Sequence, residues 1–288
     1  QDIRNDVVVS VDRIRKVGET YRVIRNALRY ELSNLFDFDP ARHTVPDTQL
    51  NGLDRWILGE LATLERAVAA AYDACEFHAV YQNLSQFAAV ELSAVYHDLV
   101  KDRLYTDPAH STRRRSTQTA LHRLLAALCK MLAPMLAFTA DEAWEFIPGK
   151  SVGSVHLAEW TPSEFVVPEA EQAAWRELFR LREQALPELE KARQAKTIGK
   201  SLEAKLIVSG PESALAAAKA QADTLRELLN VSQLEFAPGS DGPVAFAVSR
   251  ADGEKCARCW HCETSVGTVA EHPTICARCV KAVQESGQ

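Results

Sequence analysis

The sequence predicts a mainly α-helical protein: an antiparallel helical bundle followed by a small α/β unit and a zinc knuckle. Three observations carry this prediction. Apolar residues recur at helical spacing through the first half of the chain, strand-like alternation begins after residue 200, and two Cys-x-x-Cys pairs stand near the end. With 288 residues, 47% of them hydrophobic, the chain is long enough for two or three domains with real cores.

Five helices are expected in the first half. Each shows one apolar face and most connections are short, so the helices should pack as an antiparallel bundle that ends near residue 150. Thr139 and Glu142 have the spacing of a capping box at the start of the fifth helix. The expected helices are residues 12–36, a helix that follows Asn51-Gly52, residues 76–105, residues 112–132 and a short helix after Phe138.

The second half changes its period and therefore its structure. A linker rich in turn signals is followed by a long helix in which Pro187 should produce a kink. Alternating apolar residues then predict strands. The expected elements are a linker at 151–170, a helix at 169–195, a strand at 204–208, a helix at 212–229 and strands at 231–236 and 244–248. The expected domains are 1–150 (helical bundle), 151–253 (linker, long helix and α/β junction domain) and 254–288 (zinc knuckle).

The paired cysteines predict one structural zinc ion. Sixteen residues separate the two Cys-x-x-Cys pairs, a spacing typical of a four-thiolate site, and a closed set of four sulfurs keeps no position for water or substrate. Disulfides or a redox dithiol are alternatives for the same residues. Cys262 permits a second register with Cys259, and His261 and His272 are further potential ligands. The expected ligands are Cys256, Cys259, Cys276 and Cys279.

The overall composition says less about function than the cysteine pairs do. The net charge of −6 argues against a protein that is basic throughout, although local patches decide nucleic-acid binding. The start of the chain lacks the pattern of a secretory signal, and the longest apolar stretch, 124–138, is interrupted by Lys130 and Pro134. We therefore expect a cytoplasmic protein without a membrane segment. No group of residues has the pattern of a catalytic site.

Two groups of arginines stand out. Arg22, Arg25 and Arg29 recur along one face of the first helix, and three consecutive arginines, 113–115, open the fourth helix, where cations oppose the helix dipole. A phosphate backbone would explain both groups. A solvated helix face is the alternative for the first group, and a charged loop is the alternative for the second.

Several segments together resemble the isoleucyl-tRNA synthetase family, in family order over nearly the whole chain. The zinc module and the Lys-Asp-Arg-Leu-Tyr segment favour this family over the valine and leucine enzymes. Departures are few: the thiol of Cys262 and Pro187 inside a helix. The segments that carry the resemblance are Tyr21 to Tyr30 with Asn34 to Pro40, Tyr96 to Tyr105, Leu132 to Trp144, Ser154 to Trp160, Ile198 to Ala204, and the two cysteine pairs with Trp260 and His261.

The resemblance implies a tRNA-binding portion of a larger ATP-dependent isoleucine–tRNA ligase. The His-x-Gly-His and Lys-Met-Ser-Lys-Ser signatures of the catalytic core do not occur here, so ATP-dependent catalysis and editing should lie upstream, and this chain should be inactive alone. The expected partner is tRNA(Ile), held by a monomer through its anticodon end. The expected RNA contacts are Arg22, Arg25, Asn26, Arg29, Lys101, Arg103, Arg258 and Trp260.

Each expected RNA contact has a structural alternative. Asn26 could bridge backbone groups, the Lys101-Asp102-Arg103 segment could form an internal salt-bridge cluster, and Trp260 could cover the zinc ion. For the whole chain, the alternatives are the corresponding region of a valine or leucine enzyme, or a free-standing helical adaptor whose zinc knuckle binds protein.

Overall fold

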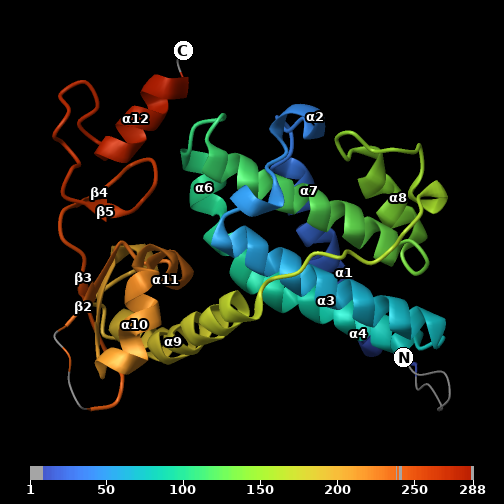
Figure 1. Ribbon diagram of the computed structural model, residues 1–288, viewed down its shortest axis with the longest axis horizontal. Coiled ribbons are helices and arrows are strands. Elements are labelled where there is room, and N and C mark those ends of the chain that lie inside the picture. Colours follow the sequence, from blue (N-terminus) through green and yellow to red (C-terminus); the bar gives the residue numbers. More distant parts are fainter. Residues whose placement is uncertain (1–8, 238, 240–241, 287–288) are drawn as a thin grey trace. The chain divides into compact units, whose positions relative to one another are not determined.

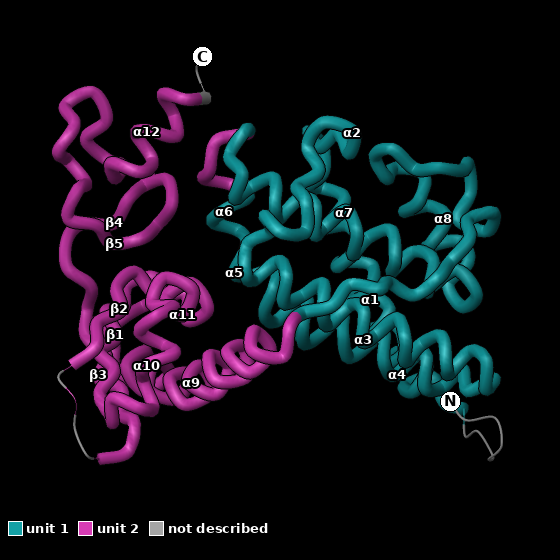
Figure 2. Tube along the Cα trace, in the orientation of Figure 1, with its two compact units in different colours: residues 1–104, 110–167 teal, residues 105–109, 168–288 magenta. Residues whose placement is uncertain are grey.

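A computed structural model describes residues 9–237, 239 and 242–286. The chain divides into two compact units (Figure 2). Unit 1 contains residues 1–104 and 110–167, and unit 2 contains residues 105–109 and 168–288. The short segment 105–109 therefore belongs with the C-terminal part of the chain, although bundle helices precede and follow it in the sequence. The two units are described separately below.

Unit 1 is built almost wholly of helices (Figure 1), which confirms the predicted mainly α fold. Within the described residues, no helix is both long enough and apolar enough to cross a membrane. The helices that form unit 1 are α1 (Val11–Ser33), α2 (Pro40–His43), α3 (Gly52–Asp73), α4 (Phe77–Phe87), a π-helical segment (Ala88–Tyr96), α5 (His97–Leu99), α6 (Lys101–Thr106, whose last two residues belong to unit 2), α7 (Thr112–Leu132) and α8 (Ala137–Glu145), with 3-10 turns at Asp47–Gln49 and Val155–Leu157.

A buried carboxylate lies at the centre of unit 1. Asp54, on α3, is fully buried and accepts hydrogen bonds from Tyr96 Oη at 2.7 Å and Ser116 Oγ at 2.6 Å. Thr117 Oγ1 donates to the same carboxylate at 3.1 Å, and Arg103 Nη1 lies 3.2 Å from it. Burial, followed by the neighbouring carboxylate, raises the pKa of Tyr96, which keeps its phenol a hydrogen-bond donor. One side chain thus joins α3, the π segment, α6 and α7.

The third predicted helix, 76–105, is interrupted by the π segment. Ser93 Oγ donates to the carbonyl of Ala88, five residues earlier, at 2.6 Å. A π segment places one extra residue in the turn, so side chains on its two sides follow different faces. The apolar spacing that predicts one uninterrupted helix does not reveal this insertion.

Helix α1 is attached to the bundle through a second buried pair. Glu31 is fully buried, and its Oε1 lies 3.3 Å from His97 Nε2. Burial raises the pKa of Glu31, and the hydrogen bond with His97 opposes that shift. The ring of Tyr30 stacks on His97 with 4.3 Å between centroids, and its hydroxyl donates to the His97 carbonyl at 2.9 Å. These contacts hold the C-terminal half of α1 against α5.

The predicted capping box at Thr139 is wrong. Helix α8 begins at Ala137, after Leu136, so Thr139 and Glu142 lie inside the helix. Both side chains instead face α1. Thr139 Oγ1 lies 3.0 Å from Tyr21 Oη, and Glu142 accepts two hydrogen bonds from Arg25, at 2.7 and 3.1 Å. A Thr-x-x-Glu pattern therefore joins two helices here.

Unit 2 contains the long helix α9 (Glu169–Gln194) and a three-stranded sheet. The helix continues through Pro187. Strand β1 (Ala204–Ser209) is central, pairs in parallel with β2 (Gln233–Phe236) and is antiparallel to β3 (Ala245–Arg250). Helices α9, α10 (Glu212–Ala220) and α11 (Ala222–Leu229) lie on one side of the sheet (Figure 1). The predicted small α/β unit is confirmed.

The expected helix at 212–229 is broken in two. Gln221 has φ −123° and ψ 37°, outside the helical region, and ends α10 just before α11 begins. The central strand shows why the sheet needs helices on one side. Its side chains at Ala204, Leu206 and Val208 are fully buried, whereas Lys205, on the opposite face, pairs with two carboxylates. Period-two burial of this kind requires cover on one face only.

We predict that Asp54→Ala destabilises the protein by about 3–5 kcal/mol, because it leaves the buried Arg103 guanidinium without its carboxylate. Glu188→Ala is the matched control: it removes a carboxylate of an exposed pair with Lys191 and should cost no more than about 0.5 kcal/mol. Urea unfolding followed by circular dichroism measures both. Equal destabilisation by the two variants would contradict the central role of Asp54.

Candidate metal centre and nucleic-acid interface

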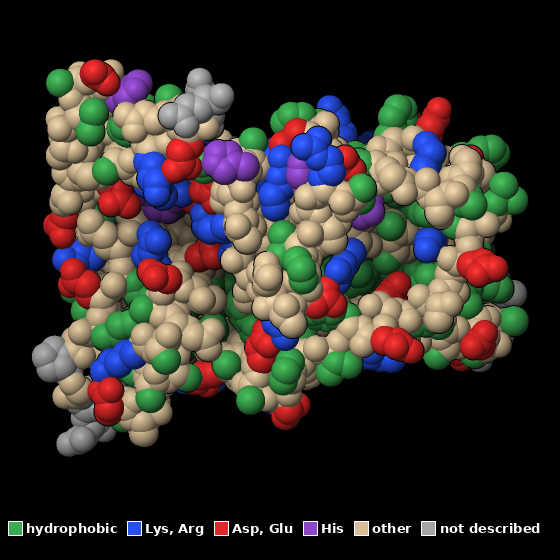
Figure 3. Space-filling model, turned by 45° about the horizontal axis from the view of Figure 1, so that its top comes forward, with side chains coloured by type: hydrophobic (Ala, Val, Ile, Leu, Met, Phe, Trp, Pro, Cys, Tyr) green, Lys and Arg blue, Asp and Glu red, His purple; other side chains and the backbone are tan. Residues whose placement is uncertain are grey.

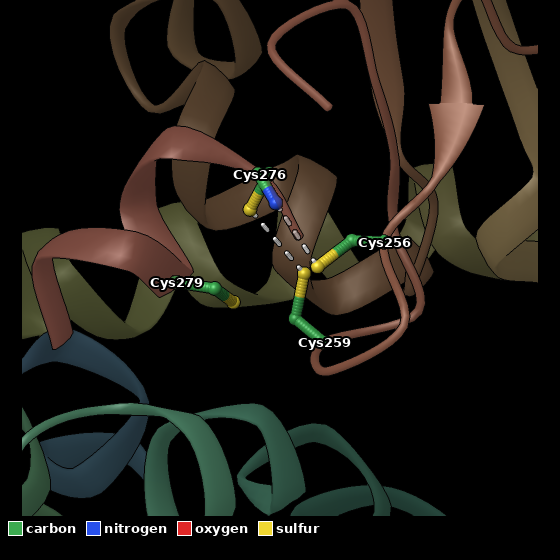
Figure 4. A group of neighbouring side chains, drawn as sticks. All are labelled: Cys256, Cys259, Cys276 and Cys279. Carbon is green, nitrogen blue, oxygen red and sulfur yellow. Dashed lines mark hydrogen bonds between the residues drawn. The ribbon is translucent and has the colours of Figure 1, made fainter. Parts of the chain in front are cut away.

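Four buried cysteines converge at the C-terminal end of unit 2. The thiols of Cys256, Cys259, Cys276 and Cys279 offer ligand atoms that all lie within 4.8 Å of one another (Figure 4). Val266 and Ile275 pack against the cluster. Cys262 is buried but lies outside the cluster. Its backbone N–H donates to Ser232 Oγ at 2.8 Å and so attaches the cysteine module to the end of β2.

The geometry of the cluster fits a tetrahedral zinc ion. With Zn–S distances of about 2.3 Å, the sulfurs of a tetrahedron lie about 3.8 Å apart. Cys259 Sγ and Cys276 Sγ are 3.8 Å apart. The backbone N–H of Cys276 donates to Cys256 Sγ at 3.3 Å, a contact that favours a thiolate (Figure 4). All four donors are soft and buried, so the residues fit one structural Zn²⁺ and leave no open coordination position.

Hydrogen bonding makes the thiols unequal. Burial raises the pKa of Cys256, but backbone N–H groups of Cys259, Cys276 and Arg258 outweigh it, and the pKa falls to about 6. The hydrogen bond to Cys279, followed by burial, raises the pKa of Cys259 to about 12. Binding of a metal must therefore displace a proton that Cys259 would otherwise hold, which couples zinc affinity to pH.

Tight turns bring the two cysteine pairs together. Strand β4 (Glu254–Lys255) pairs antiparallel with β5 (Cys262–Glu263), so the loop between them carries Cys256 and Cys259, and helix α12 (Ala277–Ser286) begins directly after Cys276. Gly253 precedes the hairpin with φ +86°, and a Cβ there would lie 2.4 Å from the Glu263 carbonyl carbon. Only glycine permits that approach.

The turn that ends the first cysteine pair exposes Trp260. Its backbone has φ +65°, in the left-handed region, and its ring is 55% exposed. Lys200 Nζ lies 5.5 Å from the ring centroid, within the range of a cation–π contact. Arg258, two residues earlier, is directed elsewhere in unit 2: its Nη1 donates to the carbonyl of Thr106. Trp260 thus presents an aromatic face, whereas Arg258 has a structural partner.

Helix α1 carries an exposed polar face. Arg22, Arg25, Asn26 and Arg29 are all exposed and lie at helical positions 0, 3, 4 and 7, so they form one stripe. Arg25 is paired with Glu142. Among the described residues, no carboxylate pairs with Arg22 or Arg29, and Asn26 has no side-chain hydrogen bond. We call these four residues the α1 stripe.

The end of the third predicted helix is different. Arg103 is 3% exposed and bound to Asp54 and Thr117, so it has no surface to offer a phosphate. We therefore withdraw the expected RNA contact at Arg103 and assign it to the bundle core. Lys101 remains exposed and pairs with Asp98 at 2.8 Å. Asp102 lies 3.5 Å from Arg113, so each member of the Lys101-Asp102-Arg103 segment has a partner within unit 1.

The three arginines that open α7 also have internal partners. Arg114 makes two hydrogen bonds to the carboxylate of Asp37, at 2.6 and 2.9 Å, and Arg115 lies 3.3 Å from the same carboxylate. Burial raises the pKa of Asp37, but the hydrogen bonds from Arg114 and Gln118 outweigh it and lower the pKa. Asp37, in the turn after α1, therefore compensates Arg114 and Arg115, and Asp102 pairs with Arg113, so a phosphate is not needed to explain these cations.

Exposed aromatic rings are the surface feature that the sequence does not predict. Phe36 is 82% exposed, and the Arg114 guanidinium lies 6.0 Å from its ring centroid. Phe138 and Phe146, at the two ends of α8, are also exposed. Apolar residues at helical spacing are expected in a core, so the spacing does not predict that these rings are exposed. Their position at or near helix ends is the one signal in the sequence that could have indicated exposure. Exposed rings provide stacking faces for unstacked bases.

Residues 54–208 match the family of anticodon-binding domains of tRNA ligases, and residues 253–282 match a zinc finger found in FPG and IleRS. The first match covers more than half of the chain. The chain belongs to the tRNA-ligase anticodon-binding family. The zinc-finger match spans all four clustered thiols, and together they identify the cluster as a structural zinc site.

Curated relatives of this chain include isoleucine–tRNA ligases. It is 42% identical to the enzyme of Syntrophotalea carbinolica over 99% of its own length, 38% identical to that of Sodalis glossinidius over 100%, and 39% identical to that of Moorella thermoacetica over 99%. In each case the chain spans 32% of the relative's length. The resemblance to isoleucyl-tRNA synthetases is confirmed.

We predict that Cys276→Ser lowers bound zinc well below about one ion per chain, because it removes one of four thiolates. Cys262→Ala is the matched control and should keep full zinc content, since its thiol lies outside the cluster. Atomic absorption on purified protein measures the metal. Loss of zinc from Cys262→Ala as well as from Cys276→Ser would show that Cys262 is a ligand, as the register with Cys259 requires.

Chelation of zinc should release the C-terminal module while the bundle stays folded. Residues 254–286 have little core besides the thiol cluster, whereas unit 1 is held by its own buried residues. Hydrogen exchange should therefore accelerate in this segment only, with the helical circular dichroism signal largely kept. Loss of all helical signal on chelation would contradict the independence of the bundle.

Proposed function

We propose that this chain binds tRNA through its anticodon end, as the recognition portion of an isoleucine–tRNA ligase. The observation that carries the proposal is the α1 stripe, an exposed polar face with two uncompensated arginines on a bundle of the anticodon-binding family. In the longer protein, contacts of the α1 stripe would hold tRNA(Ile) while ATP-dependent aminoacylation proceeds in a catalytic core outside these residues. We place the protein in the cytoplasm and expect it to act as a monomer.

The charge distribution supports binding by local contacts. The net charge is −6, and on the face shown in Figure 3 lysine and arginine side chains lie interspersed with acidic ones. A phosphate would bind most readily to cations that form no ion pair with a carboxylate, and among the described residues Arg22 and Arg29 meet that condition. Phosphate contacts of this kind position the RNA, and stacking on exposed aromatic rings would contact its unpaired bases.

Trp260 is the candidate for base contact in unit 2. Its exposed ring directly follows Cys259, one of the four clustered thiols, so a bound metal would fix the orientation of a stacking surface. Lys200 beside the ring supplies a cation for the adjoining phosphate. Arg258 and Lys101 remain candidate RNA contacts, although each already has a partner within the protein. RNA binding at Arg258 would compete with its hydrogen bond to the Thr106 carbonyl, and RNA binding at Lys101 would compete with its ion pair with Asp98.

The proposal is tested by titrating the chain with an isoleucine tRNA transcript and with a transcript whose anticodon is changed, each at low and near-physiological salt. Binding should weaken steeply as salt rises, because bound phosphates release counterions. Preference for the isoleucine anticodon is the expected result. Absence of binding to either transcript at low salt would contradict the proposal and favour a protein-binding adaptor.

We predict that Arg29→Gln weakens binding of both transcripts and lowers the slope of log affinity against log salt by about 1, the value for one lost phosphate contact. Arg176→Gln is the control with the same change in net charge, at an exposed arginine of α9 that pairs with Glu169. An equal loss in both variants would mean that net charge, and not the α1 stripe, governs binding.

A further inference from the structure

A pocket opens between α1 and α8 in unit 1, and the anticodon-binding assignment does not account for it. It has a volume of about 190 Å³. Leu28 and Leu32 of α1 and Ala143 of α8 contribute apolar surface, and Leu28 is 2% exposed. Phe146 lines the same pocket with a ring that is 66% exposed. The pocket therefore combines a dry floor with an accessible aromatic face.

The size of the pocket limits what can enter. Pockets for drug-sized ligands measure roughly 300–1,000 Å³. A volume of 190 Å³ suits a single ring system. A planar ring would bury its face against Phe146 and the leucines, because aromatic faces pack well on other aromatic rings and on aliphatic side chains. This shape favours a flat heteroaromatic ligand over a segment of peptide.

The polar edge of the pocket suits a nucleobase. Arg25 holds Glu142 through two hydrogen bonds, at 2.7 and 3.1 Å, and both residues line the pocket. The hydrogen bond from Arg25 lowers the pKa of Glu142, so its carboxylate stays ionised and offers its remaining lone pairs as acceptors. Base edges carry N–H donors as well as acceptors, and Arg29, also at the pocket, is available for the phosphate of the same nucleotide.

We propose that the pocket between α1 and α8 binds one unstacked base of the RNA held by the α1 stripe, with Phe146 as the stacking ring and the Arg25–Glu142 pair at the base edge. The inference rests on the proposed function, because it requires RNA on this face of unit 1. Contacts between the α1 stripe and phosphates do not depend on the identity of the bases. The pocket would add a contact to one particular base.

Phe138 provides a matched control on the same helix. It is 92% exposed, more than Phe146, but it does not line the pocket. Phe138→Ala and Phe146→Ala therefore remove the same exposed ring from two ends of α8, and only the second alters the pocket. Phe146→Tyr keeps the aromatic face and should behave like the wild type. Thermal unfolding by circular dichroism verifies that all variants fold.

The experiment measures the affinity of these variants for the tRNA transcript and for a series of transcripts with a single abasic site at each unpaired nucleotide in turn. We expect Phe146→Ala to weaken binding about tenfold, the loss typical of one base–aromatic stack, and Phe138→Ala to leave it unchanged. One abasic position should weaken wild-type binding by a similar factor and have no further effect on Phe146→Ala, because the same contact is already lost.

The outcomes separate this inference from the function on which it rests. Salt-dependent binding by the wild type, with equal affinities for Phe146→Ala and Phe138→Ala, would overturn the pocket assignment and leave tRNA binding intact. A loss in Phe146→Ala that is additive with every abasic substitution would also overturn it, because the ring would then contact no single base. Failure of the wild type to bind any transcript would overturn both proposals.

Discussion

The bundle depends on a buried ion pair between Asp54 and Arg103. The carboxylate of Asp54 is bound by side chains from three other parts of unit 1, and one of them is the guanidinium of Arg103. A buried charge is tolerated only when it is paired and fully hydrogen-bonded, so the helices that carry these partners have one arrangement in which all are satisfied. That arrangement positions α7, against which α1 packs, and it thereby positions the exposed face of α1.

Two uses of arginine follow from this arrangement. Arg103 of α6 and Arg114 and Arg115 of α7 compensate buried or half-buried carboxylates, and they contribute to the fold. The arginines of α1 face solvent, and Arg22 and Arg29 lack carboxylate partners among the described residues. Under the proposed function, this division accounts for RNA binding by a chain with a net charge of −6. Binding depends on which cations are uncompensated, and the number of cations is a poor guide.

The sequence predicts the fold well where one periodic signal dominates. Helical spacing identifies α1, α3, α7 and α9, and cysteine spacing identifies the four thiols that cluster, because each pattern follows from local geometry. The features that the sequence does not predict share a different cause. The π segment, the break at Gln221 and the role of Thr139 with Glu142 are decided by contacts between helices that local spacing does not encode.

The same limit applies to the proposed interface. A helical wheel places Arg22, Arg25, Asn26 and Arg29 on one face, and they do share it. Arg103 lies in an equally basic segment, yet its partner is Asp54, 49 positions earlier in the chain. The pocket at Phe146 requires two helices that are more than 100 residues apart in sequence, as the Arg25–Glu142 pair shows. No single stretch of sequence contains that information.

The central claim is that this chain holds tRNA by its anticodon arm through the exposed face of α1. Nuclease footprinting of the tRNA transcript on the intact chain tests it most directly. We predict protection confined to the anticodon stem and loop, lost on heparin competition and weakened in Arg29→Gln. Protection of the acceptor stem instead, or a footprint in Arg29→Gln that matches the wild type, would contradict it.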